Sequence, residues 1–380
     1  MKLSVAALAP LGAGMLFCVL LSLATGSGPF ALMTTIGQGA WGGAQNAVST
    51  IVKVTPLLLS GLAVSLAYHA GLLNIGAEGQ LTLGALAAAV VGCAAGALPP
   101  ILLAPLTLLA GAAVGGLWAL PAVWLQEKRG VHEVITCLLF NHTAAYLADF
   151  LARGPLGDGS AMARTPLIAD GAAWPCLARF GGVGVTLAPF AAVLLALLVH
   201  AWLTRTAWGF ETMASGTNPF AARAAGVPVR AWRRRAFAAS GAIAGLAGAL
   251  EVVAVHHRFY AAFSPGYGFD GIAVAFLAGN APGWLWASSL LLASLRSTDK
   301  WLQITLGMSP NAITLIEAVL LLAVVSRTGW ERLAASVASR ISARGGLGPD
   351  APPDAPPDAP PDAPPDAPPD APSGVDEGGR

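Results

Sequence analysis

The sequence predicts an all-α polytopic membrane protein with about ten transmembrane helices. Of its 380 residues, 55% are hydrophobic and only 11% are charged, whereas an ordinary soluble domain carries roughly 25% charge. Uncharged runs such as 5–25, 101–125 and 182–203 reach or approach the ~20 residues that a spanning helix needs. Because there are several such runs, one removable signal peptide does not explain the pattern.

The apolar runs and the turn signals between them place the spans in order along the chain. The ten spans are residues 5–25, 54–70, 79–98, 101–125, 131–151, 183–203, 236–254, 268–280, 283–296 and 311–326. With both termini in the cytoplasm, thirteen Lys and Arg residues fall on the inner side and seven on the outer side. This arrangement follows the positive-inside bias, so we expect cytoplasmic N- and C-termini.

Composition divides the chain into a transmembrane domain over residues 1–345 and an acidic tail over residues 346–380. The tail repeats APPD five times from Ala351 to Asp370. Proline removes backbone donors and the repeats offer little apolar surface to bury, so we expect a disordered, Pro-rich appendage. Inert low-complexity sequence and a partner-binding arm are both open interpretations of it.

Two stretches are poor continuous helices, because each mixes several glycines with an acid. They are residues 71–84 (GLLNIGAEGQLTLG) and residues 266–283 (GYGFDGIAVAFLAGNAPG). Non-helical backbone survives at membrane depth only where protein or a water-filled cavity satisfies it. One break in each half of a chain is typical of transporters built from inverted repeats. We therefore expect interrupted helices and inverted repeats, the alternative being two cytoplasmic or interfacial elbows.

Polar side chains within the predicted spans are candidates for a solute pathway, because lipid disfavours them. The candidates are Asn74, Glu78, Gln80, Asn141 and Asp270. Glu78 and Asp270 have a second interpretation, since an acid at a helix N-terminus also stabilises that helix by roughly 0.3–1 kcal/mol. For Asn141, two turns after Glu133, structural hydrogen bonds between helices are the favoured interpretation.

Other polar and reactive side chains show no spacing typical of an active site or a metal site. Acidic and histidine residues near predicted span ends are explained by snorkelling or capping; they are Glu251, His256, His257 and Glu317. The four cysteines are far apart and lack metal-ligand spacing; they are Cys18, Cys93, Cys137 and Cys176. We therefore expect no catalytic residue, no bound metal and no cofactor.

The longest polar insert between spans, residues 204–235, carries six arginines and one acid. A short helix is expected over residues 219–225, because a capping asparagine, a first-turn proline and a following glycine are all in place. Small residues on such a helix let another protein approach closely. The candidate contact residues are Asn218, Ala221, Ala222 and Gly226. The cluster Arg233–Arg235 is interpreted as an anchor to anionic lipid headgroups.

This loop and the run AFAASGAIAGLAGALEV after it resemble the coupling loop of permeases in ATP-binding-cassette (ABC) importers for branched-chain amino acids, simple sugars and nucleosides. The same resemblance is carried by PLLLSGLAVSLAYHAGLLNIGAEGQLTLGAL, GVHEVITCLLFNHTAAYLADFL and GYGFDGIAVAFLAGN, which together span most of residues 54–326. NIGAEGQ is the most specific signature and indicates the nucleoside and simple-sugar branch. Two departures are His69, where relatives usually have Arg, and Phe220, where the general motif often has Glu.

The resemblance implies a permease subunit that translocates a nucleoside or simple sugar across a bacterial cytoplasmic membrane. Its implied partners are a separate ATPase subunit, a second and different permease subunit, an extracytoplasmic binding protein and membrane lipid, with no nucleic acid. The residues agree, because no GxxxxGK[ST] motif is present and the chain therefore lacks a P-loop to hydrolyse ATP itself. A stand-alone secondary transporter or channel is the alternative, although such a protein has no need of a small-residue cytoplasmic helix.

Overall fold

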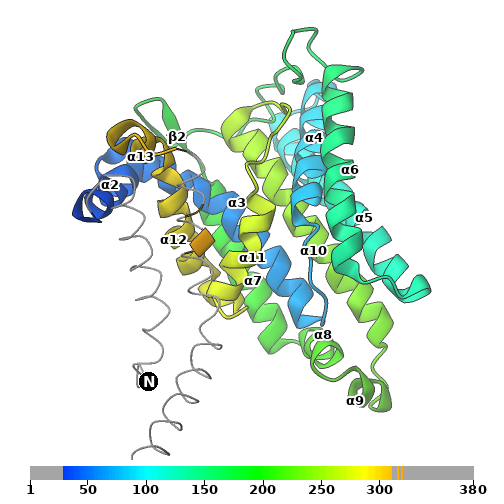
Figure 1. Ribbon diagram of the computed structural model, residues 1–380. Helices are drawn as coiled ribbons and strands as arrows, with labels where there is room; N and C mark the ends of the chain where they lie inside the picture. The colour runs from blue at the N-terminus through cyan, green and yellow to red at the C-terminus, as the bar shows by residue number, and fades with distance from the viewer. Residues whose placement is uncertain (1–28, 310–314, 316–317, 320–380) are drawn as a thin grey trace, which may run out of the picture. The chain divides into compact units, whose positions relative to one another are not determined.

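The computed structural model describes residues 29–309, 315 and 318–319, and these are mostly helical (Figure 1). The elements are α2 (Pro29–Trp41), α3 (Ala44–His69), α4 (Ala77–Ala94), α5 (Pro100–Arg129), α6 (Glu133–Arg153), β1 (Ala178–Phe180), β2 (Val183–Val185), α7 (Ala188–Arg205), α8 (Ala207–Thr217), α9 (Pro219–Ala224), α10 (Val229–Glu251), the π-helical turn η1 (Val252–His256), α11 (Tyr267–Leu277), the 3-10 turn η2 (Pro282–Trp284), α12 (Leu285–Ser297) and α13 (Asp299–Leu306). The strands β1 and β2 form a small antiparallel sheet between α6 and α7. The APPD tail and the first predicted span lie outside the described residues, as does most of the last predicted span.

Six helices of the described part are long and apolar enough to cross a membrane: α3, α4, α5, α6, α7 and the continuous helix α10–η1. Each coincides with a predicted span. The spans predicted at 268–280 and 283–296 are instead the shorter helices α11 and α12, of 11 and 13 residues. At 1.5 Å per residue these two cover about half to two-thirds of the ~30 Å hydrocarbon thickness. The described residues therefore form a multi-pass helical membrane fold.

Both glycine-rich stretches contain breaks in the helical backbone. Residues 70–76 separate α3 from α4, and Gly71 has the left-handed φ of 74° that glycine adopts without strain. In the second stretch, α11 follows the non-helical segment 257–266, and a turn at 278–281 separates it from η2 and α12. The α-helical residues within these stretches are thus confined to the start of α4 and to α11.

Glycines allow the central helices α4, α5 and α10 to touch at the backbone. A Cβ atom on Gly245 of α10 would overlap the carbonyl oxygen of Gly111 on α5, and one on Gly84 of α4 would overlap the backbone of Gly245. One turn away, a Cβ atom on Gly241 would lie 2.6 Å from the carbonyl oxygen of Gly115. Such G-xxx-G pairs favour close packing where lipid supplies no hydrophobic drive for association.

The short helix α11 packs against the second half of α3 (Figure 1). A Cβ atom on Gly271 would lie 2.6 Å from the carbonyl carbon of Ser60, so no larger residue fits there. Beyond the end of α11, the carbonyl oxygen of Asn280 accepts hydrogen bonds from Ser65 Oγ at 2.7 Å and from His69 Nε2 at 2.9 Å. Both helices therefore run in the same direction and end close together.

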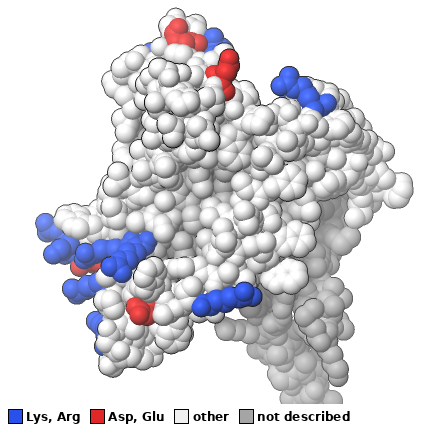
Figure 2. Space-filling model, turned by 180° about the vertical axis from the view of Figure 1, so that it is seen from behind, with Lys and Arg blue, Asp and Glu red and all other residues white. Residues whose placement is uncertain are grey.

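The outer helices α5, α6 and α7 expose large apolar side chains, among them Leu109, Leu117, Leu139, Phe150 and Leu194. Figure 2 shows Lys, Arg, Asp and Glu side chains gathered toward two opposite ends of this face, with a broad band free of them in between. An apolar band of this kind is expected to face lipid or another membrane subunit.

Candidate functional site

The first break, residues 70–76, is held by buried amide side chains. Asn74 is fully buried, and its Nδ2 donates to Gln80 Oε1 at 2.8 Å and to Ser240 Oγ at 2.7 Å. Gln80 Nε2 donates back to Asn74 Oδ1 at 3.1 Å, and Ser240 Oγ donates to the carbonyl oxygen of Ala63 at 2.6 Å. The two candidates therefore lie together, and their hydrogen bonds join α3, α4 and α10.

Asn141, on α6, closes the same break from the opposite side of α4. Its Nδ2 donates to the carbonyl oxygen of Ile75 at 2.8 Å, and its Oδ1 accepts from the backbone N–H of Gly79 at 2.9 Å. Gly79 lies in the first turn of α4, where backbone N–H groups have no partner inside the helix. Glu133, two turns earlier, accepts from the backbone N–H of Leu73 at 3.3 Å. Asn141 thus joins α6 to the first turn of α4, and Glu133 joins α6 to the break.

Glu78 lies where the N-termini of α4 and α11 meet. A Cβ atom on Gly268 of α11 would overlap the backbone of Glu78, so the two first turns are in direct contact. Glu78 Oε2 accepts a hydrogen bond from the backbone N–H of Gly268 at 2.7 Å. Each helix N-terminus carries a partial positive charge, and this carboxylate therefore stabilises their contact. Glu78 caps the helix of the other half of the chain as well as lying in the first turn of its own.

Asp270, in the first turn of α11, forms a two-pronged ion pair with Arg296 of α12. Arg296 Nη2 lies 2.9 Å from Asp270 Oδ1, and Arg296 Nε lies 3.0 Å from Asp270 Oδ2. Lys53 Nζ on α3 donates to the carbonyl oxygen of Arg296 at 2.6 Å. Asp270 is 8% exposed, so this guanidinium compensates a buried charge. Arg296 was not among the residues predicted for the site, although a basic residue inside a predicted span was a signal for it.

The structure groups the candidate pathway residues into two sets. Glu78 and Asp270 both lie at the first turn of α11, while Gln80 bonds to Asn74 and Asn74 bonds to Ser240 of α10. Positions 78 and 80 are two residues apart on α4, which places their side chains on nearly opposite faces of that helix. The start of α4 therefore separates a packed amide network from a cluster of charged groups.

The loop 204–235 contains the expected short helix, α9, at one end of the helices (Figure 1). Asn218 Oδ1 accepts from the backbone N–H of Ala221 at 3.0 Å, and Gly226 follows the helix with a left-handed φ of 84°. Ala221 is exposed, whereas Ala222 is only 5% exposed and faces the protein. The two predicted contact alanines therefore differ, and only Ala221 is available to another protein.

An exposed aromatic residue dominates the outer face of α9. Phe220 is 77% exposed, and the Arg223 guanidinium lies over its ring at 5.1 Å from the centroid. Aromatic and arginine side chains are the residues most enriched at the energetic centres of protein interfaces. Phe220, a departure from the general motif, is thus the most exposed large apolar side chain of this helix.

The loop is fastened directly to the first break. Arg233 donates from Nη2 to the carbonyl oxygen of Gly71 at 2.9 Å and from Nε to that of Ala70 at 3.2 Å. A Cβ atom on Gly71 would lie 2.9 Å from the Cα atom of Gly216 in α8. The interpretation of Arg233 as a lipid anchor is therefore wrong, because the guanidinium binds backbone carbonyls left free where α3 ends. A displacement of α8 and α10 would reach residues 70–71 through these contacts.

The comparison with known protein families decides the class of this protein. Residues 46–325 match the family described as the permease component of the branched-chain amino acid transport system. The match runs from α3 past α13 and includes both breaks and the loop 204–235. The chain belongs to this family.

Two relatives of this permease cover most of its length. A glucose ABC transporter permease protein from Haloferax volcanii is 36% identical over 297 residues, which is 76% of this chain and 78% of the relative. A guanosine ABC transporter permease protein from Bacillus subtilis is 34% identical over 328 residues, covering 83% of this chain and 90% of the relative. No solved structure matches the chain.

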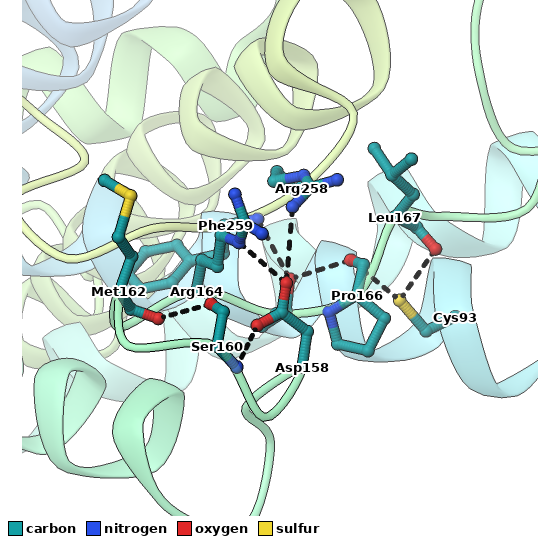
Figure 3. Close-up of polar contacts among 10 residues, drawn as sticks. Cys93, Asp158, Ser160, Met162, Arg164, Pro166, Leu167, Arg258 and Phe259 are labelled. Atoms are coloured by element: carbon teal, nitrogen blue, oxygen red, sulfur yellow. Dashed lines mark hydrogen bonds and ion pairs between the residues drawn. The ribbon is translucent and has the colours of Figure 1, made fainter.

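The permease carries a folded connection between α6 and α7 that is tied to the segment after η1 (Figure 3). Asp158 pairs with Arg164 at 2.7 Å and with Arg258 at 3.5 Å, and it accepts from the backbone N–H of Ser160 at 2.9 Å. Hydrogen bonds from Ser160, followed by the Arg164 guanidinium, lower the pKa of Asp158 to about 2. Ion pairing and backbone hydrogen bonds therefore order this connection.

Acidification is expected to loosen the connection between α6 and α7. The pKa of Asp158 in the folded chain, about 2, is below its ordinary value of 3.8. Its stabilisation is therefore complete above 3.8 and is lost as the pH falls toward 2. Limited proteolysis of residues 154–182 should accelerate over this range in the wild type. In Asp158→Asn the rate should already be raised at neutral pH, and an unchanged rate there would contradict the role of the ion pairs.

Proposed function

We propose that this permease is the membrane subunit of an ABC importer that carries a nucleoside or a simple sugar. The observation that carries the proposal is the similarity, at 34–36% identity over most of the chain, to permeases named for glucose and guanosine transport. A third relative, a nucleoside ABC transporter permease protein from Lactococcus lactis, is 28% identical over 321 residues. The solute class common to these names is a polyhydroxylated ring, alone or joined to a base.

In this proposal, a separate ATPase subunit docks on α9 and drives transport. Its contact surface is formed by Ala221 and the exposed Phe220, with Asn218 and Gly226 shaping the helix ends. The loop then lies in the cytoplasm together with both termini. A second, different permease subunit and an extracytoplasmic binding protein complete the importer in a bacterial cytoplasmic membrane. We also propose that this chain crosses the membrane ten times and is built from inverted repeats.

The proposed solute pathway passes the meeting point of α4 and α11. Glu78 and Asp270 face this region from the two breaks, while Asn74, Gln80 and Asn141 hold the first break in its shape. Polar groups and helix N-termini at discontinuous helices are the usual way in which transporters line a site within the membrane. We assign the two acids to the pathway and the three amides to its support.

Reconstitution of the whole importer tests this function. The permease, its co-encoded ATPase, the second permease and the loaded binding protein are placed in liposomes, and uptake of labelled guanosine and glucose is measured with and without ATP. ATP-dependent uptake of either solute is expected. Uptake that follows an ion gradient without ATP would instead establish a secondary transporter, and no uptake of either solute would exclude the proposed substrate class.

Ala221→Trp tests the docking surface on α9. The exposed position accepts a large side chain without disturbing the permease, but the added ring should prevent close approach of the ATPase. We expect ATP hydrolysis stimulated by the loaded binding protein to fall about tenfold or more, because disrupting a residue at the energetic centre of an interface weakens binding by that amount. Ala145→Trp, at an exposed position of α6, is the matched control. Full stimulation in Ala221→Trp would refute docking at α9.

A further inference from the structure

A small cavity with a mixed polar and apolar lining lies between α3, β2, the end of α10, the π-helical turn η1 and the start of α11. Its volume is about 190 Å³, and five of its wall residues have polar side chains: Ser49, Lys53, Glu251, His256 and Tyr267. These polar residues come from α3, the continuous helix α10–η1 and α11. Glu251 and His256 lie near the end of the long helix Val229–His256, in line with the prediction of span-end positions, and their side chains also line this cavity.

The π-helical turn brings Glu251 and His256 together. They are five residues apart, a spacing that places side chains on different faces of an α-helix but stacks them in a π-turn, whose hydrogen bonds run from i to i+5. His256 Nε2 consequently lies 3.4 Å from Glu251 Oε2. The imidazole ring is held edge-on by Tyr260 and Phe263, at centroid distances of 5.2 and 5.3 Å. Turns of this kind are frequently found at functional sites.

Glu251 has unused hydrogen-bonding capacity. Its side chain is only 6% exposed, yet among the described residues its one charged or hydrogen-bonding partner is the His256 ring at 3.4 Å. An ionised carboxylate can accept about four hydrogen bonds, and a buried one is costly unless donors surround it. The remaining acceptor capacity of this carboxylate therefore faces the cavity that it lines.

The cavity adjoins the charged cluster of the proposed pathway. Tyr267 is the first residue of α11, three positions before Asp270. Lys53, from the opposite wall, donates to the carbonyl oxygen of Arg296, the residue that pairs with Asp270. A solute in the cavity would thus lie next to the meeting point of α4 and α11.

We infer that this cavity binds the hydroxyl groups of a sugar ring, either a free sugar or the ribose of a nucleoside. The inference rests on the proposed function and names the part of the solute that the chain recognises. The Glu251 carboxylate accepts from ring hydroxyls, while the Tyr267 hydroxyl donates to a ring oxygen. The volume lies below the ~300–1,000 Å³ of pockets that enclose a whole drug-sized ligand. The cavity therefore holds one ring, and a nucleobase extends outside it.

Hydroxyl deletion combined with Glu251→Gln tests the assignment in the complete importer. Uptake of guanosine is compared with uptake of 2′,3′-dideoxyguanosine, and uptake of glucose with 2-deoxyglucose, in wild type and Glu251→Gln at equal membrane abundance. The preference of the binding protein cancels, because the same protein serves both permeases. Hydrogen bonds to charged groups are worth about 1.5–3 kcal/mol. Discrimination against the deoxy solute should therefore be about tenfold or more stronger in wild type than in Glu251→Gln.

The outcomes separate the cavity from the proposed function. If Glu251→Gln reduces uptake of parent and deoxy solutes by the same factor, or not at all, the carboxylate does not contact hydroxyls and the inference is overturned. Loss of discrimination in the guanosine pair assigns the ring to a nucleoside, and loss in the glucose pair assigns it to a free sugar. No uptake of any probe by wild type would reject the proposed function and the sugar assignment together.

Two further substitutions serve as a control and as an alternative variant for this test. Asp149→Asn makes the same acid-to-amide change in an exposed ion pair on α6, and it should leave both uptake ratios unchanged because such pairs contribute little. If Glu251→Gln does not assemble, Tyr267→Phe removes a single hydroxyl from the cavity wall and should also lower the discrimination. Retention of full discrimination by Tyr267→Phe would then count against the inference.

Discussion

Replacing Arg296 with methionine is expected to destabilise the permease severely. Asp270 is 8% exposed and would lose both hydrogen bonds of its ion pair while keeping its charge. Removing one partner of a buried pair costs about 3–5 kcal/mol, because the remaining charge is left without compensation. The yield of monodisperse protein after detergent extraction and its thermal unfolding midpoint should both fall sharply.

The double variant Asp270→Asn/Arg296→Met supplies the control. It removes the orphaned charge, and a buried pair replaced as a whole is often nearly neutral, so most of the lost stability should return. Transport by this stable double variant then isolates the pathway role proposed for Asp270. If Arg296→Met alone were as stable as wild type, Asp270 would have to be neutral or solvated, and the ion pair would not contribute to the stability of the fold.

Replacing Gly245 with alanine is expected to have the second large effect. The new methyl group would overlap the carbonyl oxygen of Gly111, which belongs to the backbone and cannot rotate away. Helices α5 and α10 would have to separate, and α4, in contact through Gly84, would follow. We expect a loss of about 3 kcal/mol or more, at or above the upper end of overpacking costs, seen as a lower unfolding midpoint in detergent.

Gly37→Ala is the matched control for this substitution. Gly37 is also helical, in α2, but no atom lies within 4 Å of the position that a Cβ would occupy. The same change should there be neutral or stabilising by up to about 1 kcal/mol, the difference in helix propensity. Equal effects at the two positions would show that backbone contact between α5 and α10 does not limit stability.

The six long helices follow from the sequence because spanning length and apolarity are local properties. The same is true of α9, whose ends are set by an asparagine cap and a left-handed glycine. The break at 70–76 was also visible, since glycines interrupt an apolar run there. In the second predicted stretch, 266–283, most residues form α11, and the non-helical residues are Gly266 and those at 278–281. The local signal did not give the length of α11 and α12, because apolar composition alone does not distinguish a half-helix from a full one.

Side-chain partners could not be obtained from local patterns. Glu78 bonds to Gly268, which is 190 positions away, and Arg233 bonds to Gly71 at a separation of 162. Whether Ala221 or Ala222 faces outward depends on how α9 lies against the rest of the fold. The interpretation of Arg233 as a lipid anchor was wrong for this reason, since exposure of a basic residue depends on what packs over it.

By itself, the sequence determined the membrane class, the positions of the long helices, the capped helix of the loop 204–235 and the break before α4, all of which depend on residues within one helix length. Only the tertiary structure decided which charge meets which partner and where a cavity remains. Glu251 and His256 illustrate the difference, because a π-turn and the approach of α3 and α11 place two ordinary span-end residues around a polar cavity. Long-range packing sets such groups, since a buried charge is tolerated only where separate elements supply its partners.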